Sequence, residues 1–268
     1  MGLYVNHKGA LEYLTAPLLS ETPHCFSTRF GGVSEGCLES LNLGVHLGDA
    51  PENVMENYRI LGEAVGFKPE HTVFTKQVHS DIVEVVGKQE RGRGLLRPVE
   101  NACDGLITNE TDVVLTVFSA DCTPVLLFDP VLRVIGAVHA GWRGTAAKIP
   151  ARAVEKMIAV YGCRPENIRA AIGPCISQCC FETDNDVPNA MIDAFGNAAN
   201  EATRSVGQKY YVNLKLLNAL ALREVGVTMI DIAEECTACE PHRFWSHRKV
   251  GNQRGSLAAM IGLRGDAT

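Results

Sequence analysis

The sequence lacks several features that would narrow its function at once. Nowhere do 18 apolar residues run together, so no membrane-spanning helix is expected. The chain has 25 Lys and Arg against 31 Asp and Glu, and this formal charge of −6 disfavours binding to nucleic acid or to an anionic membrane. There is no P-loop, and no G-x-G-x-x-G opens a helix after a strand, so ATP and dinucleotide folds are not supported. We expect no nucleic-acid or membrane partner, and the sequence indicates no protein partner.

The N-terminus, "MGLYVNHKGALEYLTAPLL", has no basic segment followed by an apolar one. We therefore expect an unexported, cytoplasmic protein. In a reducing compartment its ten cysteines are expected to be free thiols or metal ligands rather than disulfides. A chain of 268 residues can bury a sizeable core, and no repeat, low-complexity tract or linker divides it. The prediction is one domain over residues 1–268.

Short runs of β-branched and apolar residues predict the sheets. We expect strands within residues 71–86, 104–109, 113–121, 124–130, 134–141, 167–176, 229–237 and 254–263, and helices within 49–67, 144–162, 184–197 and 209–227. The segment 23–49 is rich in Gly, Ser and Asn and is predicted to be a strand end followed by an ordered loop. Because the strands occur in groups rather than alternating with helices, the pattern predicts an α+β fold of layered mixed β-sheets flanked by helices.

Two histidines and one cysteine form the first candidate site. His79, Cys122 and His139 each lie in or beside an apolar strand region. Two nitrogen ligands and a thiolate with a vacant fourth position match a catalytic zinc site, whereas the alternative is a core thiol with two hydrogen-bonded histidines. The local context favours a function, since Asp121 and Cys122 interrupt an apolar run and the glycines of "AGWRG" after His139 permit close approach of a ligand.

Two further groups of cysteines are interpreted as structural. The spacing Cys236-x2-Cys239-x2-His242-x4-His247 suggests a zinc finger, but a finger leaves about a dozen residues between its two pairs, so we treat the pattern as accidental. Cys175, Cys179 and Cys180 follow a Gly-Pro turn and are predicted to pack as small apolar side chains, with a second metal or redox role as the alternative.

Four polar residues are candidates for substrate binding. They are Arg29, Asn42, Gln77 and Arg143. An arginine fork suits a phosphate or carboxylate group because it donates hydrogen bonds in pairs. The alternative for each is a solvated or structural role.

Many short motifs, taken in order, resemble one known family. They are "FSTRFGGVSEG", "SLNLGVHLGD", "ENYR", "KQVHS", "CDGLIT", "SADCTPVLLFDP", "VIGAVHAGWRG", "IGPCISQCCFE", "ECT" and "FWSHRK". In these motifs, which span nearly the whole chain, the sequence resembles the laccase-domain purine nucleoside phosphorylases, also described as polyphenol oxidases and as peptidoglycan editing factors.

This resemblance implies a fold, a metal and an activity. The family fold is similar to that of bacterial cytotoxic deamidase toxins, and the family's catalytic Zn²⁺ would be held here by His79, Cys122 and His139. The implied reactions are phosphorolysis of adenosine, inosine, guanosine and methylthioadenosine, with phosphate as co-substrate, and deamination of adenosine. Asp121 would then move protons during deamination, and an arginine would share the charge of phosphate.

Several alternatives stay open. A copper polyphenol oxidase is disfavoured because the chain has only eight histidines and lacks a His-Cys-His pattern. A metal-free hydrolase would use Cys122 as nucleophile and His139 as base. An enzyme that edits peptidoglycan precursors would share the same pocket, and a non-enzymatic metal-binding protein would show no turnover.

Overall fold

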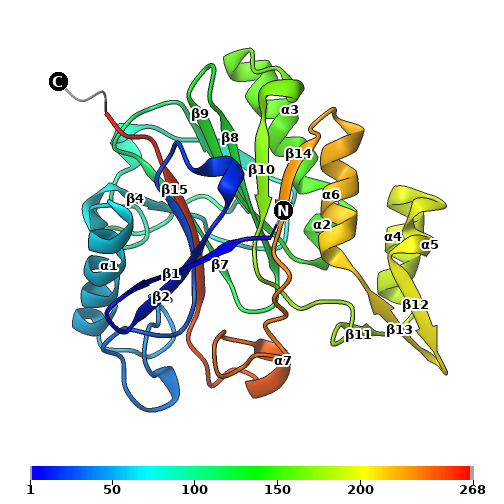
Figure 1. Cartoon of the computed structure of the whole chain (residues 1–268), viewed down its shortest axis with the longest axis horizontal. Coiled ribbons are helices and arrows are strands. Elements are labelled where there is room, and N and C mark those ends of the chain that lie inside the picture. Colours follow the sequence, from blue (N-terminus) through cyan, green and yellow to red (C-terminus); the bar gives the residue numbers. More distant parts are fainter. Residues whose placement is uncertain (1, 266–268) are drawn as a thin grey trace.

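The framework of the protein is a pair of six-stranded sheets (Figure 1). The computed structural model describes residues 2–265. The first sheet has the strand order β1-β2-β3-β15-β7-β4, and the second has the order β14-β10-β8-β9-β6-β5. Most neighbouring strands are antiparallel, but β4 with β7, β5 with β6 and β10 with β14 are parallel. Both sheets are therefore mixed, as predicted.

The strands and helices have the following bounds. The first sheet contains β1 (Tyr4–Lys8), β2 (Leu11–Thr15), β3 (His24–Ser27), β4 (Thr72–Phe74), β7 (Val114–Ser119) and β15 (Leu257–Gly262). The second contains β5 (Val83–Val85), β6 (Gly105–Thr108), β8 (Thr123–Asp129), β9 (Val134–Ala140), β10 (Arg169–Ile172) and β14 (Met229–Ile232). A third, smaller sheet contains β11 (Glu182–Thr183), β12 (Thr203–Val206) and β13 (Lys209–Val212). The helices are α1 (Pro51–Val65), α2 (Trp142–Ala146), α3 (Ile149–Tyr161), α4 (Asp186–Phe195), α5 (Ala198–Glu201), α6 (Leu214–Glu224) and α7 (His247–Val250).

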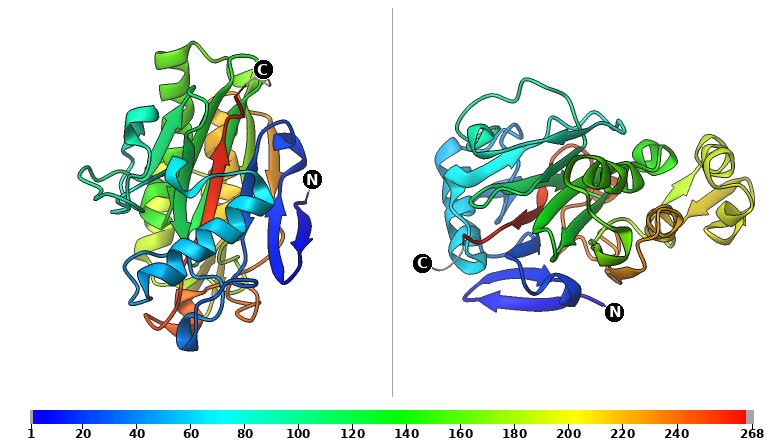
Figure 2. Two further views of the ribbon diagram at one scale, coloured as in Figure 1. Left: turned by 90° about the vertical axis from the view of Figure 1, so that its left-hand side faces the viewer. Right: turned by 90° about the horizontal axis from the view of Figure 1, so that it is seen from above.

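Alternation along the central strands divides the core into layers. On β15, Ala259 and Ile261 join the apolar cluster between the two large sheets, whereas Met260 joins the cluster beneath α1. On the second sheet, Leu126 packs between the sheets and Leu127 packs in the cluster that includes α3 and α6 residues. The order of layers is thus helix, sheet, sheet, helices, and Figures 1 and 2 show α1 on the opposite side of the sheets from α3 and α6. The predicted α+β fold is confirmed.

The predicted helix at 49–67 is observed as α1, and its sequence explains its bounds. Pro51 occupies the first turn, where its missing N–H group costs nothing, and Gly66 ends the helix with φ 95°. Tyr58 is buried against the first sheet. In the 144–162 segment, the long helix α3 begins at Ile149, so Pro150 again lies in a first turn, and the short helix α2 precedes it.

One helix prediction is wrong, one hairpin was not predicted, and His79 lies between two short strands. The segment 209–227 is not one helix: its first residues form β13, and α6 begins after Asn213, whose side chain accepts a hydrogen bond from the N–H of Leu216. The β1–β2 hairpin at the sheet edge was not predicted (Figure 2). His79 lies in the connection between β4 and β5 rather than in a strand.

Within residues 2–265, no helix combines the length and the apolar character that crossing a membrane requires.

Candidate metal centre

The three predicted ligands converge where β8 begins and β9 ends. Cys122 directly precedes β8, and the register of the two strands pairs Pro124 with His139, which brings Cys122 close to that imidazole. His79 approaches from the β4–β5 connection, with its Nε2 3.7 Å from the Sγ of Cys122. One ligand atom from each residue lies within 4.8 Å of the other two, a spacing that one metal ion can span.

Asp104 orients the imidazole of His139 and holds the backbone of His79. Its Oδ1 lies 2.8 Å from the Nδ1 of His139, which leaves the Nε2 of that ring for a metal. The same carboxylate accepts hydrogen bonds from the backbone N–H groups of Val78, His79 and Ser80. These bonds hold His79 in the left-handed region at φ 61°, which few residues other than glycine adopt. The sequence analysis missed Asp104, although its signal is visible as a lone acid directly before the apolar run of β6.

The charges at the site favour a thiolate. Burial alone would raise the pKa of Cys122, but His139 and His79 outweigh it and lower the pKa to about 6. Burial would lower the pKa of His139, but Cys122 and Asp104 raise it to about 9. Asp104 also keeps its charge: its pKa lies well below the usual range, because hydrogen bonds from His139 and Ser80 outweigh burial. Without metal, the pair is therefore a thiolate beside an imidazolium, and the thiolate is the form that binds metal.

Gly141 leaves the space that the ligands occupy. A Cβ atom at this position would lie 2.4 Å from the Cδ2 of His79 and 3.3 Å from the Sγ of Cys122. The φ of Gly141 is −65°, so close approach rather than an unusual backbone conformation requires glycine here. Two imidazole nitrogens and one thiolate around this space are a donor set that zinc accepts with its fourth position open.

A cavity of about 510 Å³ lies over the three ligands. Its other lining residues are Gln77, Phe118, Ser119, Ala120, Asp121, Ile176, Phe181, His247, Arg248, Arg254 and Ser256. A larger, mostly apolar cavity of about 730 Å³ shares Gln77, Phe118, Arg254 and Ser256 with it. The two cavities therefore adjoin at one shared wall.

Three of the predicted substrate-binding residues lie outside the cavity lining. The guanidinium of Arg29 donates to the carbonyls of Glu39 and Pro241 and lies 3.8 Å from the centre of a Trp245 ring. Asn42 is fully buried, and its side chain bonds to Gly44, Asp49 and Ser256. Arg143 is exposed and stacks over Trp142.

Gln77 and Asp121 do line the cavity, and hydrogen bonds hold both. The amide of Gln77 accepts from the N–H and donates to the carbonyl of Phe118. The carboxylate of Asp121 accepts from the hydroxyl of Thr237 at 2.6 Å and from the N–H of Arg248 at 2.6 Å. Asp121 thereby connects the turn before Cys122 to the loop after β14 and to α7.

Two arginines that the sequence analysis did not single out reach the cavity instead. Arg248 donates to the carbonyls of Cys180 and Glu182, which fixes its guanidinium in the wall. The Nε of Arg254 is buried and has no hydrogen-bond partner among residues 2–265. Arg248 lies in α7, within "FWSHRK", and Arg254 lies in the following loop, within "GNQRGS", and the approach of both segments to the site depends on tertiary packing rather than on any local pattern.

The zinc-finger spacing is accidental, as interpreted, but the interpretation of the other cysteines as apolar packing needs correction. Cys236 and Cys239 lie with Cys179 and Cys180, and not with His242 and His247. Cys175 is buried, as apolar packing predicts, but Cys179 is exposed. The packing interpretation is therefore wrong for Cys179.

Comparison with known proteins identifies the family. A family model described as multi-copper polyphenol oxidoreductase laccase matches residues 23–264. The chain belongs to this laccase family. The family member "Purine nucleoside phosphorylase YlmD" of Bacillus subtilis is 34% identical over 89% of this chain and 87% of its own length. "Purine nucleoside phosphorylase YfiH" of Escherichia coli K12 is 35% identical over 89% of this chain and 93% of its own.

A solved structure from the same laccase family has the same fold. The crystal structure of YlmD from Geobacillus stearothermophilus superimposes with a TM-score of 0.92 at 33% identity, covering 97% of this chain and 99% of that one. The family predicted from the sequence motifs is thereby confirmed.

Proposed function

We propose that this chain is a zinc-dependent purine nucleoside phosphorylase that also deaminates adenosine. Its substrates would be adenosine, inosine, guanosine and methylthioadenosine, with phosphate as co-substrate. The observation that carries the proposal is the set of His79, Cys122 and His139 beneath a cavity, in a chain whose relatives are named purine nucleoside phosphorylases. The proposal places the enzyme in the cytoplasm, where thiols of this kind stay reduced.

The three ligands suit zinc better than a copper oxidase centre. Bound zinc would supply Lewis-acid chemistry at its open fourth position. Asp104 orients His139, and Cys122 is already a thiolate, whereas His139 would release the proton on its Nε2 when the metal binds. Copper polyphenol oxidation, which the family description names, is the alternative, and the metal content of the purified protein distinguishes the two.

Arg254 is the proposed phosphate ligand. Its Nε is buried without an acceptor among the residues that the structure describes, and Arg254 lines both cavities. A phosphate oxygen would satisfy this donor, and the fixed guanidinium of Arg248 would add positive charge. Phosphate held here would be oriented toward a ribose at the shared wall.

The larger cavity is the proposed purine site. Apolar side chains, including Val45, Leu47, Leu95 and Phe118, give it surfaces that a purine ring can cover. In phosphorolysis, a phosphate oxygen forms a bond to the anomeric ribose carbon while the bond to the purine nitrogen breaks, and the nitrogen keeps the electron pair and takes up a proton. The cavity walls would orient the nucleoside and the phosphate toward each other, and this orientation would account for much of the acceleration over the uncatalysed reaction.

Asp121 is the proposed proton-transfer group in deamination. It lines the cavity beside Cys122, and its side chain accepts hydrogen bonds from the Thr237 hydroxyl and the N–H of Arg248. This role is a prediction from the sequence. So is substrate binding by Arg29, Asn42, Gln77 and Arg143, and of these four only Gln77 is in the cavity lining.

The test is phosphate-dependent release of base from inosine and adenosine, measured with zinc content. We expect the wild type to turn over both nucleosides and Cys122→Ala to lose at least about 100-fold in kcat/KM together with one zinc per chain. Cys37→Ser, which changes an exposed cysteine outside the cavity, is the matched control and should keep both. A zinc-replete Cys122→Ala variant with intact phosphorolysis would overturn the assignment.

A second candidate is a metal-free Cys–His hydrolase. The low pKa of Cys122 beside His139 also suits a thiolate nucleophile. Activity that survives chelation, with covalent trapping of Cys122 by an electrophilic substrate, would support this reading and contradict the zinc mechanism. Bound zinc without nucleoside turnover would instead direct the assays to peptidoglycan precursors.

A further inference from the structure

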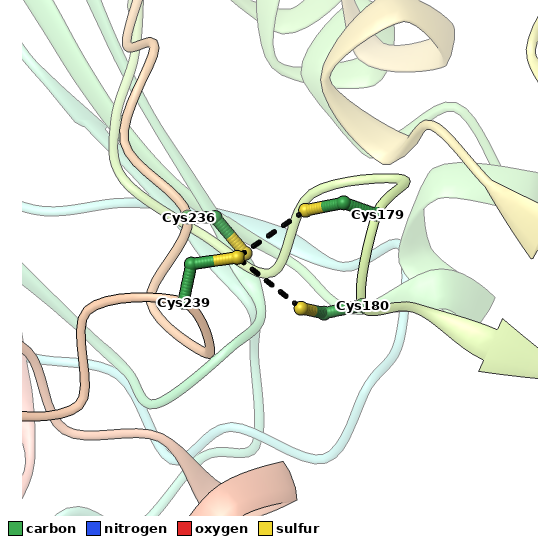
Figure 3. A group of neighbouring side chains, drawn as sticks. All are labelled: Cys179, Cys180, Cys236 and Cys239. Carbon is green, nitrogen blue, oxygen red and sulfur yellow. Dashed lines mark hydrogen bonds between the residues drawn. The ribbon is translucent and has the colours of Figure 1, made fainter.

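A second group of metal-ligating side chains lies outside the site described above. Cys179 and Cys180 belong to the β10–β11 loop, and Cys236 and Cys239 to the loop after β14. The four Sγ atoms all lie within 4.8 Å of one another. Figure 3 shows the four sulfurs pointing toward a common centre from the two loops.

The sheet brings these loops together. β10 and β14 are parallel neighbours, so both chains leave the sheet at the same edge. An isolated bridge continues this pairing from Cys175 to Cys236, and the N–H of Thr237 donates to the carbonyl of Cys175. The buried ammonium group of Lys215 donates to the carbonyls of Ala233 and Glu235. The position of the cluster is thus set by the backbone and not by contacts among the cysteines.

The distances between the sulfurs match ligands around one ion. The Sγ of Cys239 lies 3.5 Å from that of Cys179 and 3.4 Å from that of Cys180. Tetrahedral zinc with bonds of about 2.3 Å to sulfur separates its ligands by about 3.8 Å, whereas a disulfide requires about 2.05 Å. The four sulfurs therefore need small shifts to bind zinc and a larger one to form a disulfide.

The surroundings also suit a structural site. The N–H of Ser177 donates to the Sγ of Cys236 at 3.2 Å, which stabilises a thiolate. Cys236 is buried with Ile176 and Ala238 in a small apolar cluster, whereas Cys179 and Cys239 are exposed and leave a path for a metal to enter. Lys215 adds a buried positive charge beside the loop.

We propose that Cys179, Cys180, Cys236 and Cys239 bind a second zinc ion as a closed four-thiolate site. Each thiol still protonated releases its proton as its sulfur bonds to the metal, and no redox change occurs. With all four positions filled by protein, the ion has a structural role. This proposal goes beyond the phosphorylase activity and does not depend on it.

The site would support one wall of the catalytic cavity. Ile176 and Phe181, which flank the first cysteine pair, line that cavity. Arg248 bonds to the carbonyl of Cys180, and Thr237, between the second pair, bonds to Asp121. A zinc ion joining the two loops would therefore hold the wall against the turn that carries Cys122.

The first test counts zinc in the purified, reduced chain. We expect two zinc ions in the wild type and one in either Cys122→Ala or the double variant Cys179→Ser/Cys239→Ser. Combining all three substitutions should leave none, and Cys37→Ser should keep two. A wild type with one zinc that Cys122→Ala removes entirely would overturn the proposal, whatever the result of the nucleoside assays.

The second test uses the wild type and so does not depend on the folding of a variant. The zinc-loaded chain is treated with a thiol alkylating reagent before and after chelation, and modified residues are located by mass spectrometry. We expect the four cysteines to be protected only when zinc is present, while Cys37 reacts in both states. Reaction of the four in the loaded protein, or a peptide pair joined by a disulfide between the loops, would contradict a zinc site.

Discussion

At the scale of single residues, the proposed catalytic site requires a residue without a Cβ atom at position 141. Gly141 has an ordinary extended backbone with φ −65° and ψ 173°, so alanine would suit its backbone. The cost of a side chain comes from the 2.4 Å contact between the new Cβ and the Cδ2 of His79. Since His79 is already held in the left-handed region by bonds to Asp104, it has little freedom to move without losing those bonds.

Gly141→Ala should therefore displace His79 and weaken zinc binding at this site by about 10- to 100-fold, the usual effect of disturbing the surroundings of a ligand. The destabilisation of the fold should be smaller, about 1–3 kcal/mol, as for other overpacked positions. Competition with a chelating dye measures the affinity. Gly265→Ala, where a Cβ would meet nothing within 4 Å, is the control. Equal zinc affinities for the two variants would contradict the argument that Gly141 is needed to place His79 for zinc binding.

At the scale of elements, His24 links the start of β3 to the turn that follows β2. Its Nε2 accepts the N–H of Ala16 at 2.7 Å, and its Nδ1 lies 2.9 Å from the carbonyl of Thr22, so the bonds require a neutral ring protonated on Nδ1. Burial lowers the pKa of His24, and the opposing effects of the Thr22 carbonyl and of Asp231 are smaller. The folded state thus binds a proton at His24 less readily than the unfolded chain does.

The stabilisation from His24 should be complete above the unfolded pKa of about 6.5 and lost as pH falls below it, by at most about 1.4 kcal/mol per pH unit. Denaturant unfolding of the wild type and His24→Gln at pH 7.5 and 5.5 measures this effect. The free energy of unfolding should fall more on acidification in the wild type than in the variant. His7→Gln, which changes an exposed imidazole, should retain the wild-type dependence. Identical pH dependence in the wild type and His24→Gln would refute the argument.

The predictability of the elements follows from where each one packs. Strands β7, β8 and β9 are almost wholly buried, so their apolar runs mark them in the sequence. β1 is an exposed edge strand with no buried residue, and β13 precedes α6 without a clear change of pattern, so neither gave a usable signal. Cys122 and His139 could be placed at strand ends because the buried apolar runs of β8 and β9 mark where these strands lie.

The site residues that could not be predicted from the sequence lie in loops or in the short helix α7. Arg248 and Arg254 reach the cavity only because the C-terminal segment folds back over β7 and the turn before Cys122. The four-cysteine cluster joins two pairs that are far apart in the chain. The zinc-finger-like spacing of Cys236 and Cys239 to His242 pointed to a different set of ligands. Tertiary packing creates such contacts, so they cannot be predicted from the periodicity of apolar residues along the chain.

At the scale of the whole molecule, the metal sites and the main core are separate. The cluster between the large sheets is built from strand residues such as Leu126, Ile135 and Ile261, and it contains none of the seven proposed ligands. The apolar cluster beside the four cysteines is small and distinct from it. A chain of this length buries enough surface to fold without metal, so zinc is expected to order loops rather than to create the fold.

Chelation should therefore leave the sheets intact while it loosens two loops. Hydrogen exchange followed by mass spectrometry, before and after chelation, should show faster exchange in segments 175–182 and 234–248 and unchanged protection in β7, β8 and β9. The melting temperature should fall and recover when zinc is restored, because an ion that binds only the folded state stabilises it. Faster exchange throughout the sheets would mean that zinc supports the core itself. Because the two loops form one wall of the catalytic cavity, selective loosening in Cys179→Ser/Cys239→Ser should raise KM more than it lowers kcat.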